Sequence, residues 1–181
     1  MKTLETGRLI MRKWCQNDLN DFHAYVSDEQ VGRMAGFKPH HSLLESRILL
    51  DFFITKDYGW AIYHKADQRV IGFISLNKDL KRSGGIDCQS IGYSLHRDYW
   101  GHGLMTEAGE AVIAYAFETL KLDMLSVYHY PANKQSQRVI EKLGFHYDGI
   151  LRCSAKLYND EIEDEVCYSM LKQEYFARTG N

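Results

Sequence analysis

The feature that most constrains this chain is a glycine turn near its middle, where a predicted strand gives way to a long predicted helix. The strand is expected at about 87–95, Gly101 and Gly103 occupy the turn, and apolar residues then recur at helical spacing from Ala108 to Leu120. Free N–H groups at a helix start attract anions, and glycine lets a bulky diphosphate approach the backbone. We therefore expect a phosphate-bearing ligand against residues 100–106, although an ordinary strand-to-helix turn would also explain the glycine pair.

Two better-known phosphate motifs do not fit this turn. A P-loop requires a lysine shortly after its last glycine, and no lysine follows Gly103. A dinucleotide fingerprint requires a third glycine where this chain has Thr106, and it is expected in the first βα unit of a parallel fold. The turn therefore predicts neither an NTPase nor a Rossmann protein.

The rest of the chain supplies the elements around this turn. Asn17 or Asp18 can cap a first helix, and Ser42-x-x-Glu45 resembles a capping box that opens a second. Leu44, Ile48 and Phe52 follow at four-residue intervals, as on the buried face of that second helix. Strands are expected at 8–14, 59–64, 70–77, 87–95, 122–130, 147–157 and 165–171, with a polar loop at 81–85. Further helices are expected after Gly103 and at 134–143, and Asn133 can cap the latter. This mixture of hairpins and βαβ crossovers predicts a single α/β domain over residues 1–181, of mixed α+β type, in three layers.

Composition excludes several classes of protein. A chain of 181 residues suits one domain, and its net charge of −2 gives no global signature of binding to nucleic acid or anionic membranes. No stretch approaches the ~20 apolar residues of a membrane span, and the N-terminus does not resemble a secretory signal. The four cysteines form no C-x-x-C pair, and His23, His40 and His41 lack partners at ligand spacing. We therefore expect a cytoplasmic protein with reduced thiols and no metal.

Three blocks of sequence resemble the GNAT superfamily of acetyltransferases, and within it the RimJ/RimL-type branch of ribosomal-protein-alanine N-acetyltransferases. They are Glu5-Thr-Gly-Arg-Leu-Ile-Met-Arg12, the segment from Ile91 to Ala108 with its Tyr-Trp-Gly-His-Gly turn, and Asn133-Lys-Gln-Ser-Gln-Arg-Val-Ile-Glu-Lys-Leu-Gly-Phe145. The resemblance covers nearly the whole chain, from Leu4 to Leu171. Trp100 and Met105 depart from the superfamily's usual [QR]-x-x-G-x-[GA] formula.

The resemblance implies a GNAT-like fold, with a mostly antiparallel central sheet, splayed strands and about four helices. It also implies that acetyl-CoA is the donor, with its pantetheine arm beside the splayed strands and its pyrophosphate on the glycine turn. The expected cofactor-binding residues are Ser94, Leu95, Trp100, Gly101, His102, Gly103, Leu104, Met105, Thr106, Asn133, Ser136 and Lys142.

The resemblance further implies direct transfer of acetyl to an amine within a ternary complex. An α-amino group, with a reference pKa of about 7.7–8.0, would need only mild deprotonation. A backbone N–H near Ser94 or Leu95 could stabilise the oxyanion, and the Ser136 hydroxyl would protonate the leaving thiolate. Ser136 could instead be a first-turn residue that satisfies the backbone of its own helix.

Three residues are candidates for the base: Glu107, Asp164 and His102. A carboxylate at Glu107 would also be favoured in the first helical turn without any catalytic role, because it complements the helix dipole. Asp164 could instead shape the acceptor site, and a loop histidine such as His102 could be solvated. Deprotonation through water is a further alternative.

The acceptor is the least constrained part of this interpretation. The N-terminus of a protein or peptide is preferred, as in the ribosomal branch, and a polyamine, aminoglycoside or similar small amine is the alternative. The segment Asp28–Leu50 is expected to line the acceptor pocket. A non-catalytic CoA-binding sensor is the third hypothesis, and strand edges near residues 166–171 could pair in a homodimer.

Overall fold

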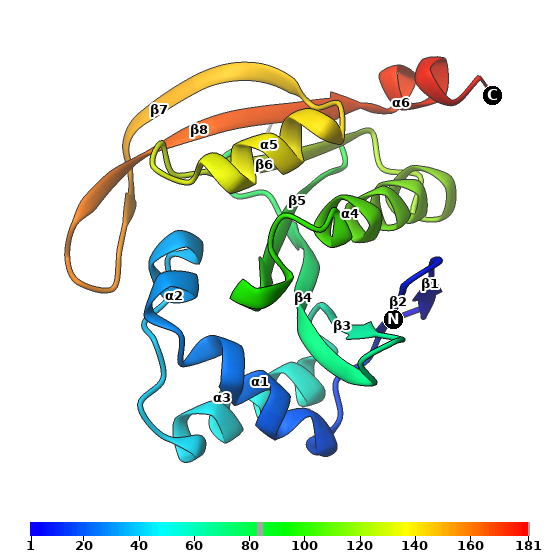
Figure 1. The fold of residues 1–181 in the computed structure, drawn as a ribbon. Coiled ribbons are helices and arrows are strands. Elements are labelled where there is room, and N and C mark those ends of the chain that lie inside the picture. The colour runs from blue at the N-terminus through cyan, green and yellow to red at the C-terminus, as the bar shows by residue number, and fades with distance from the viewer. Residues whose placement is uncertain (83–84, 181) are drawn as a thin grey trace.

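A computed structural model describes residues 1–82 and 85–180, so the expected polar loop at 81–85 lies partly outside the described residues. Within them the chain forms one eight-stranded sheet in the order β1-β2-β3-β4-β5-β6-β8-β7 (Figure 1). Among the described strands only β5 and β6 pair in parallel, which confirms the prediction of a mixed, mostly antiparallel sheet. The strands are β1 (Leu4–Glu5), β2 (Leu9–Arg12), β3 (Trp60–His64), β4 (Arg69–Lys78), β5 (Cys88–Leu95), β6 (Met124–His129), β7 (His146–Lys156) and β8 (Ile162–Leu171).

The described residues also form six α-helices, two more than the expected four. They are α1 (Leu19–Val26), α2 (Glu29–Ala35), α3 (Leu43–Lys56), α4 (Leu104–Ala114), α5 (Lys134–Lys142) and α6 (Lys172–Thr179). Short turns η1 (Gln16–Asp18) and η2 (Arg97–Tyr99) precede α1 and α4, and the π-helical turn η3 (Tyr115–Thr119) extends α4. Helices α2 and α6 have only seven and eight residues, too few to show a helical period in the sequence. None of the described helices has the length and apolar character to cross a membrane.

Alternation along β3 shows how the helices cover both faces of the sheet. Trp60 and Ile62 belong to the core cluster that includes Val112 of α4. Ala61, between them, belongs to the second cluster, with Phe22 of α1 and Leu50 of α3. Because successive strand residues point to opposite faces, α1 and α3 cover one face and α4 the other. The three-layer prediction is therefore confirmed.

Helix α3 corrects the expected position of its apolar face. Its capping residue is as predicted, since the Ser42 hydroxyl accepts a hydrogen bond from Glu45 N–H at 3.3 Å. Leu44, Ile48 and Phe52 lie outward, however, with 66%, 64% and 47% of their surface exposed. The buried side chains of the helix include Leu50 and Ser46 instead. Apolar residues occur on both sides of α3, so periodicity alone could not decide which side packs on the sheet.

The expected cap of α1 is also corrected. The chain turns through η1 before α1, and Asp18 caps nothing with its side chain at the α1 start. Its carboxylate instead accepts two hydrogen bonds from Arg12, at 2.8 and 2.7 Å, and one from Cys15 N–H at 2.9 Å. A buried carboxylate next to an arginine is better satisfied by that pair than by a helix end. Asp18 therefore fastens β2 to η1.

Two features of the sheet bear on function. Pairing between β5 and β6 ends at Ile91↔Val127, although the strands continue to Leu95 and His129. The two strands therefore separate beyond that pair, as the family resemblance implied. Strand β8, in contrast, is bonded to β6 on one side and β7 on the other. The expected free edge at residues 166–171 is therefore wrong.

Candidate functional site

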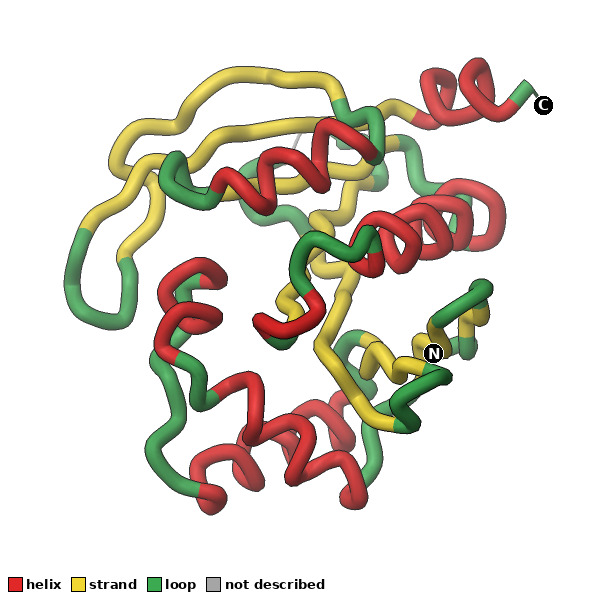
Figure 2. The backbone as a smooth tube through the Cα atoms, viewed as in Figure 1, coloured by secondary structure: helices red, strands yellow, loops and turns green. Residues whose placement is uncertain are grey.

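The glycine turn contains two residues in the left-handed backbone conformation. Gly101 and Gly103 have φ values of +79° and +74°, in the left-handed region that favours glycine. No described side chain caps the start of α4, and a Cβ on Gly101 would meet no atom within 4 Å. Figure 2 shows the loop from β5 to α4, interrupted only by the short η2. The first N–H groups of α4 are therefore open to an anion.

Side chains on both sides hold this turn in place. The indole Nε1–H of Trp100 donates to the Leu95 carbonyl at 2.8 Å, which ties the turn to the end of β5. The guanidinium of Arg8 donates from Nη1 to the His102 carbonyl at 3.0 Å. The turn is thus fixed before any ligand arrives, which reduces the entropy lost on binding.

A cavity of about 530 Å³ extends from this turn to the β7–β8 hairpin. We call its two parts the glycine-turn end (residues 100–106, with Arg138 and Lys142) and the hairpin end (Tyr128, Tyr130 and Glu165). Most of the expected cofactor-binding residues line it, namely Ser94, Leu95, Trp100, Gly101, Gly103, Leu104, Met105, Thr106, Asn133, Ser136 and Lys142. The residues that line it also carry opposite charges at the two ends, basic on α5 and acidic at Glu165.

Ser136 lies between the two ends and has a partner that the sequence did not reveal. Its hydroxyl is 2.7 Å from the Tyr93 hydroxyl, which comes from the separated end of β5. Burial raises the pKa of Tyr93, although the hydrogen bond to Ser136 partly opposes this. Tyr93 therefore keeps its proton at neutral pH, and the two hydroxyls form a pair that can pass a proton to a neighbour.

Asn133 links α5 to α2. Its Oδ1 accepts the Ser136 N–H at 3.0 Å, which is the predicted cap of α5, and its Nδ2 donates to the Met34 carbonyl at 2.9 Å. Its side chain therefore places both Ser136 and the end of α2 at the cavity. Of the expected acceptor segment, Asp28–Leu50, the residues that line the cavity are Val31, Met34 and Ala35.

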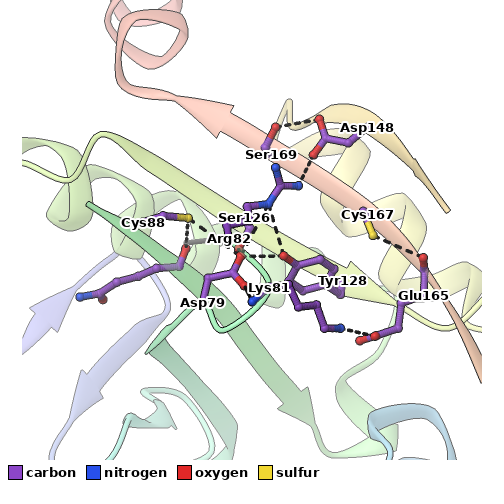
Figure 3. Close-up of polar contacts among 11 residues, drawn as sticks. Asp79, Lys81, Arg82, Cys88, Ser126, Tyr128, Asp148, Glu165, Cys167 and Ser169 are labelled. Carbon is purple, nitrogen blue, oxygen red and sulfur yellow. Dashed lines mark hydrogen bonds and ion pairs between the residues drawn. The ribbon is translucent and has the colours of Figure 1, made fainter. Parts of the chain in front are cut away.

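The hairpin end is a wall of side chains from distant parts of the sequence. Glu165, on β8, accepts hydrogen bonds from Lys81 and, at 2.7 Å, from the Ser154 hydroxyl. The Lys81 ammonium lies 4.4 Å from the centroid of the Tyr128 ring (Figure 3). Oε2 accepts both of these hydrogen bonds, and none of the described residues donates to Oε1. Glu165 therefore lines the cavity as a carboxylate that pairs with Lys81 through Oε2 and keeps Oε1 free of a described donor.

Asp79 anchors this wall from beneath. Its carboxylate accepts hydrogen bonds from the hydroxyls of Ser126 and, at 2.6 Å, Tyr128, and Arg82 lies 3.7 Å away (Figure 3). Burial would raise the pKa of Asp79, but these donors outweigh it and lower the pKa below its ordinary value. Burial and the bond to Asp79 raise the pKa of Tyr128 to about 12. Near pH 7 Asp79 is therefore ionised and Tyr128 keeps its proton. The hydrogen bond between them fixes the position of the Tyr128 ring.

His129 also borders the cavity, as a neutral imidazole. Its Nδ1 lies 2.8 Å from the Tyr130 carbonyl and must donate to it, because a carbonyl only accepts. Nε2 then carries the lone pair, and no described atom bonds to it. Burial lowers the pKa of His129, so this side chain adds no positive charge near the hairpin end at neutral pH.

The three candidate bases lie away from the cavity lining. Glu107 accepts hydrogen bonds from the Thr6 hydroxyl at 2.6 Å, from Arg8 N–H at 2.8 Å and from Arg8 Nε at 2.6 Å. Burial would raise the pKa of Glu107, but these donors lower it, which makes the carboxylate a weak base. Asp164 accepts the Cys153 N–H at 2.8 Å within the hairpin, and the His102 side chain is exposed. The geometry therefore favours none of them as the base.

Residues missed by the sequence interpretation share one property: their partners are remote in sequence. Tyr93 pairs with a residue 43 positions away, and Glu165 with one 84 positions away. Only Tyr93 carried a signal, since it adjoins Ser94 in a block that resembled the family. Among residues 1–82 and 85–180 no three His, Cys, Asp or Glu side chains gather to hold a metal ion.

Comparison with known proteins places this cavity in context. Residues 8–146 match the acetyltransferase (GNAT) domain family. The chain is 38% identical over 116 residues to the probable N-acetyltransferase YjcK of Bacillus subtilis, covering 64% of this chain and 62% of that protein. It is 29% identical over 180 residues to the uncharacterized N-acetyltransferase p20 of Bacillus licheniformis, covering 97% and 99% of the two chains.

An enzyme named for acetylating a ribosomal protein and a solved structure extend this comparison. The [ribosomal protein uS5]-alanine N-acetyltransferase of Escherichia coli is 27% identical over 92 residues, which is 51% of this chain and 46% of that protein. The crystal structure of a GNAT-family acetyltransferase from Bacillus anthracis superposes with a TM-score of 0.85 at 24% identity, covering 96% and 100% of the chains. The family match spans most of the chain and the fold agrees over its length. The chain therefore belongs to the GNAT family of acetyltransferases.

Proposed function

We propose that this chain transfers an acetyl group from acetyl-CoA to a primary amine, the N-terminal α-amine of a protein or peptide. The observation that carries the proposal is one continuous cavity, with an open helix start and cations at one end and a carboxylate at the other. The paired hydroxyls of Ser136 and Tyr93 lie between them. This arrangement suits an anionic donor and a cationic acceptor that meet beside a proton donor.

The glycine-turn end fits the donor. The N–H groups of residues 102–106 would hold the diphosphate, and the separated ends of β5 and β6 leave space for the pantetheine arm. Lys142 and Arg138 on α5 would face phosphate groups. Leu143, next to Lys142, packs against α4 so closely that a Cβ on Gly109 would approach it within 2.7 Å, so the last turn of α5 lies against α4.

The chemical step needs one new bond and one proton transfer. After the ammonium loses a proton to water, the amine nitrogen bonds to the acetyl carbon and the C–S bond breaks. The Ser136 hydroxyl would protonate the leaving thiolate and recover a proton through Tyr93, while the nitrogen releases its own to solvent. A backbone N–H near Ser94 or Leu95 would stabilise the oxyanion during this step.

Two features of the cavity and one relative support an α-amine as the acceptor. Glu165 is the single carboxylate among the described residues that line the cavity, which suits one ammonium group better than a polyamine with several. An α-amine, with a reference pKa of about 7.7–8.0, also reaches its neutral form without a strong base, and the candidate bases lie outside the cavity lining. The E. coli relative named for acetylating an alanine of ribosomal protein uS5 supports the same class of acceptor.

The proposal is tested by acetyl-CoA calorimetry combined with a thiol-release assay. Four acceptors would be compared. Two are peptides: one with a free N-terminal alanine, and one with a blocked N-terminus whose single amine is a lysine side chain. The other two are spermidine and an aminoglycoside. Thiol release that requires the free N-terminus supports the proposal, and a preference for spermidine or the aminoglycoside transfers it to small amines. Binding without release on any amine favours a non-catalytic CoA sensor, and no binding overturns the proposal.

A further inference from the structure

The opening segment Thr6–Arg8 belongs to the first block of family resemblance, yet it lines no part of the cavity. In the structure the turn between β1 and β2 lies beside α4 (Figure 1). Its hydrogen bonds to α4 all go to Glu107, in the first helical turn, and Arg8 also donates to the glycine turn itself. Arg8 therefore lies next to the expected diphosphate site, although it does not line the cavity.

Glu107 fixes the orientation of Arg8. Glu107 Oε1 accepts hydrogen bonds from the Arg8 backbone N–H and from the Thr6 hydroxyl, and Oε2 accepts one from the Arg8 side-chain Nε–H. The Glu107 side chain is 19% exposed, so this pair is partly shielded from water. An arginine held at its backbone and at Nε has few ways to reorient, and its remaining N–H groups point in set directions.

Those remaining groups lie on the glycine turn. Nη1 donates to the His102 carbonyl at 3.0 Å. Nη2 would be the nearest heavy atom to a Cβ placed on Gly103, at 3.8 Å. Among the described residues no acceptor is bonded to Nη2, and 49% of the Arg8 side chain is exposed. Two guanidinium N–H groups are thus available within reach of the open start of α4.

We propose that Arg8 is a diphosphate-binding residue and that Glu107 positions it. Nη1 holds the turn in its left-handed conformation, and Nη2 donates to an oxygen of the donor's diphosphate beside the N–H groups of α4. The inference rests on the proposed function, since it assumes acetyl-CoA as the donor. It also gives Glu107 a role that its hydrogen bonds permit, in place of the role of base.

Charge and geometry both support this role over a purely structural tie. A tie between β1–β2 and α4 is already supplied by Thr6 and by the Arg8 backbone N–H, neither of which needs a guanidinium. The guanidinium adds a planar fork whose N–H groups match phosphate oxygens. Because Glu107 balances its charge, the site is not repulsive to the nearby backbone dipoles before the donor binds.

The test compares three donors in Arg8→Ala, Arg8→Lys and the matched control Arg12→Ala. Acetyl-CoA and acetyl-dephospho-CoA both carry the diphosphate, whereas acetylpantetheine lacks it. Arg12 lies in the same N-terminal region, donates two hydrogen bonds to the Asp18 carboxylate and does not line the cavity. Its loss therefore reports on general weakening of the fold. Thiol-release kcat/KM for each donor, KM for the amine, and Tm are measured.

We expect Arg8→Ala to lower kcat/KM about tenfold for both diphosphate donors, and Arg8→Lys to recover part of it. The value for acetylpantetheine and the KM for the amine should stay unchanged, and Arg12→Ala should alter Tm alone. Equal losses on all three donors, or equal losses in Arg8→Ala and Arg12→Ala, would overturn the inference while leaving the proposed function intact. Wild-type protein that uses none of the donors would overturn the proposed function and this inference with it.

Discussion

The two ends of the cavity are built in different ways. The glycine-turn end is built mainly from the continuous segment 100–106, to which α5 adds Arg138 and Lys142, and its main binding groups are backbone N–H groups at the start of α4. The hairpin end comes from side chains of β6, β8 and the 79–82 segment, joined by contacts between residues 47 to 84 positions apart. A site made of backbone depends on conformation, whereas a site made of side chains depends on a network of partners. The two ends should therefore respond to opposite kinds of substitution.

The largest expected effect is a backbone effect at the glycine-turn end. Gly103→Val forces a β-branched residue to φ near +74°, so the turn must change shape and its N–H groups lose their alignment. We expect acetyl-CoA affinity, measured by calorimetry, to fall at least about a hundredfold. Gly180→Val is the matched control, because Gly180 has φ of +73° at the end of α6 with no atom within 4 Å of a Cβ. Equal affinity in the two variants would show that turn conformation does not matter.

The hairpin end should instead lose stability when its buried anchor is changed. Asp79→Asn replaces a carboxylate that accepts several hydrogen bonds, and we expect a loss of about 2 kcal/mol in the free energy of unfolding at pH 7. The folded-state pKa of Asp79 is lowered, so its contribution is present above the unfolded-state value of about 3.9 and disappears as pH falls through the folded-state pKa. Urea unfolding from pH 7 to pH 3 should show the gap between wild type and variant closing. A gap independent of pH would contradict the assigned ionisation.

Between the two ends, Tyr93→Phe tests the hydroxyl pair. It removes the partner of Ser136 while keeping the ring, and we expect kcat to fall about tenfold with acetyl-CoA affinity unchanged. Steady-state kinetics and calorimetry on the same samples separate the two quantities. Ser136→Ala combined with Tyr93→Phe should be little worse than Ser136→Ala alone, because both act on one proton path. Fully additive losses would mean that the two hydroxyls act independently.

The smallest expected effect separates two neighbours on β8. Glu165 lines the cavity, whereas Asp164 bonds to the Cys153 N–H within the hairpin. Glu165→Gln should raise KM for the amine about fivefold, since a charged partner of the ammonium is lost, and leave acetyl-CoA affinity unchanged. Asp164→Asn is the matched control, and its KM for the amine, measured in the same assay, should change less than that of Glu165→Gln. A larger KM effect in Asp164→Asn would restore the role that the sequence suggested for Asp164.

Much of the fold could be predicted because its signals are local. The positions of most strands along the chain, the Ser42 and Asn133 caps and the glycine turn depend on residues a few positions apart. The errors arose where local patterns were short or ambiguous. Helix α2 has seven residues, and α3 carries apolar residues on two sides, so the sheet decided which side was buried.

The sequence by itself therefore determined the glycine turn, the helix behind it and most residues that line the cavity, since backbone conformation follows from nearby residues. Only the tertiary structure decided which side chains face each other across the cavity. It paired Tyr93 with Ser136, gave Glu107 to Arg8 and set Glu165 in the cavity wall while Asp164 bonds within the hairpin. These choices depend on strand register and on contacts dozens of residues apart, and a shift of one residue in β8 would reverse the last of them.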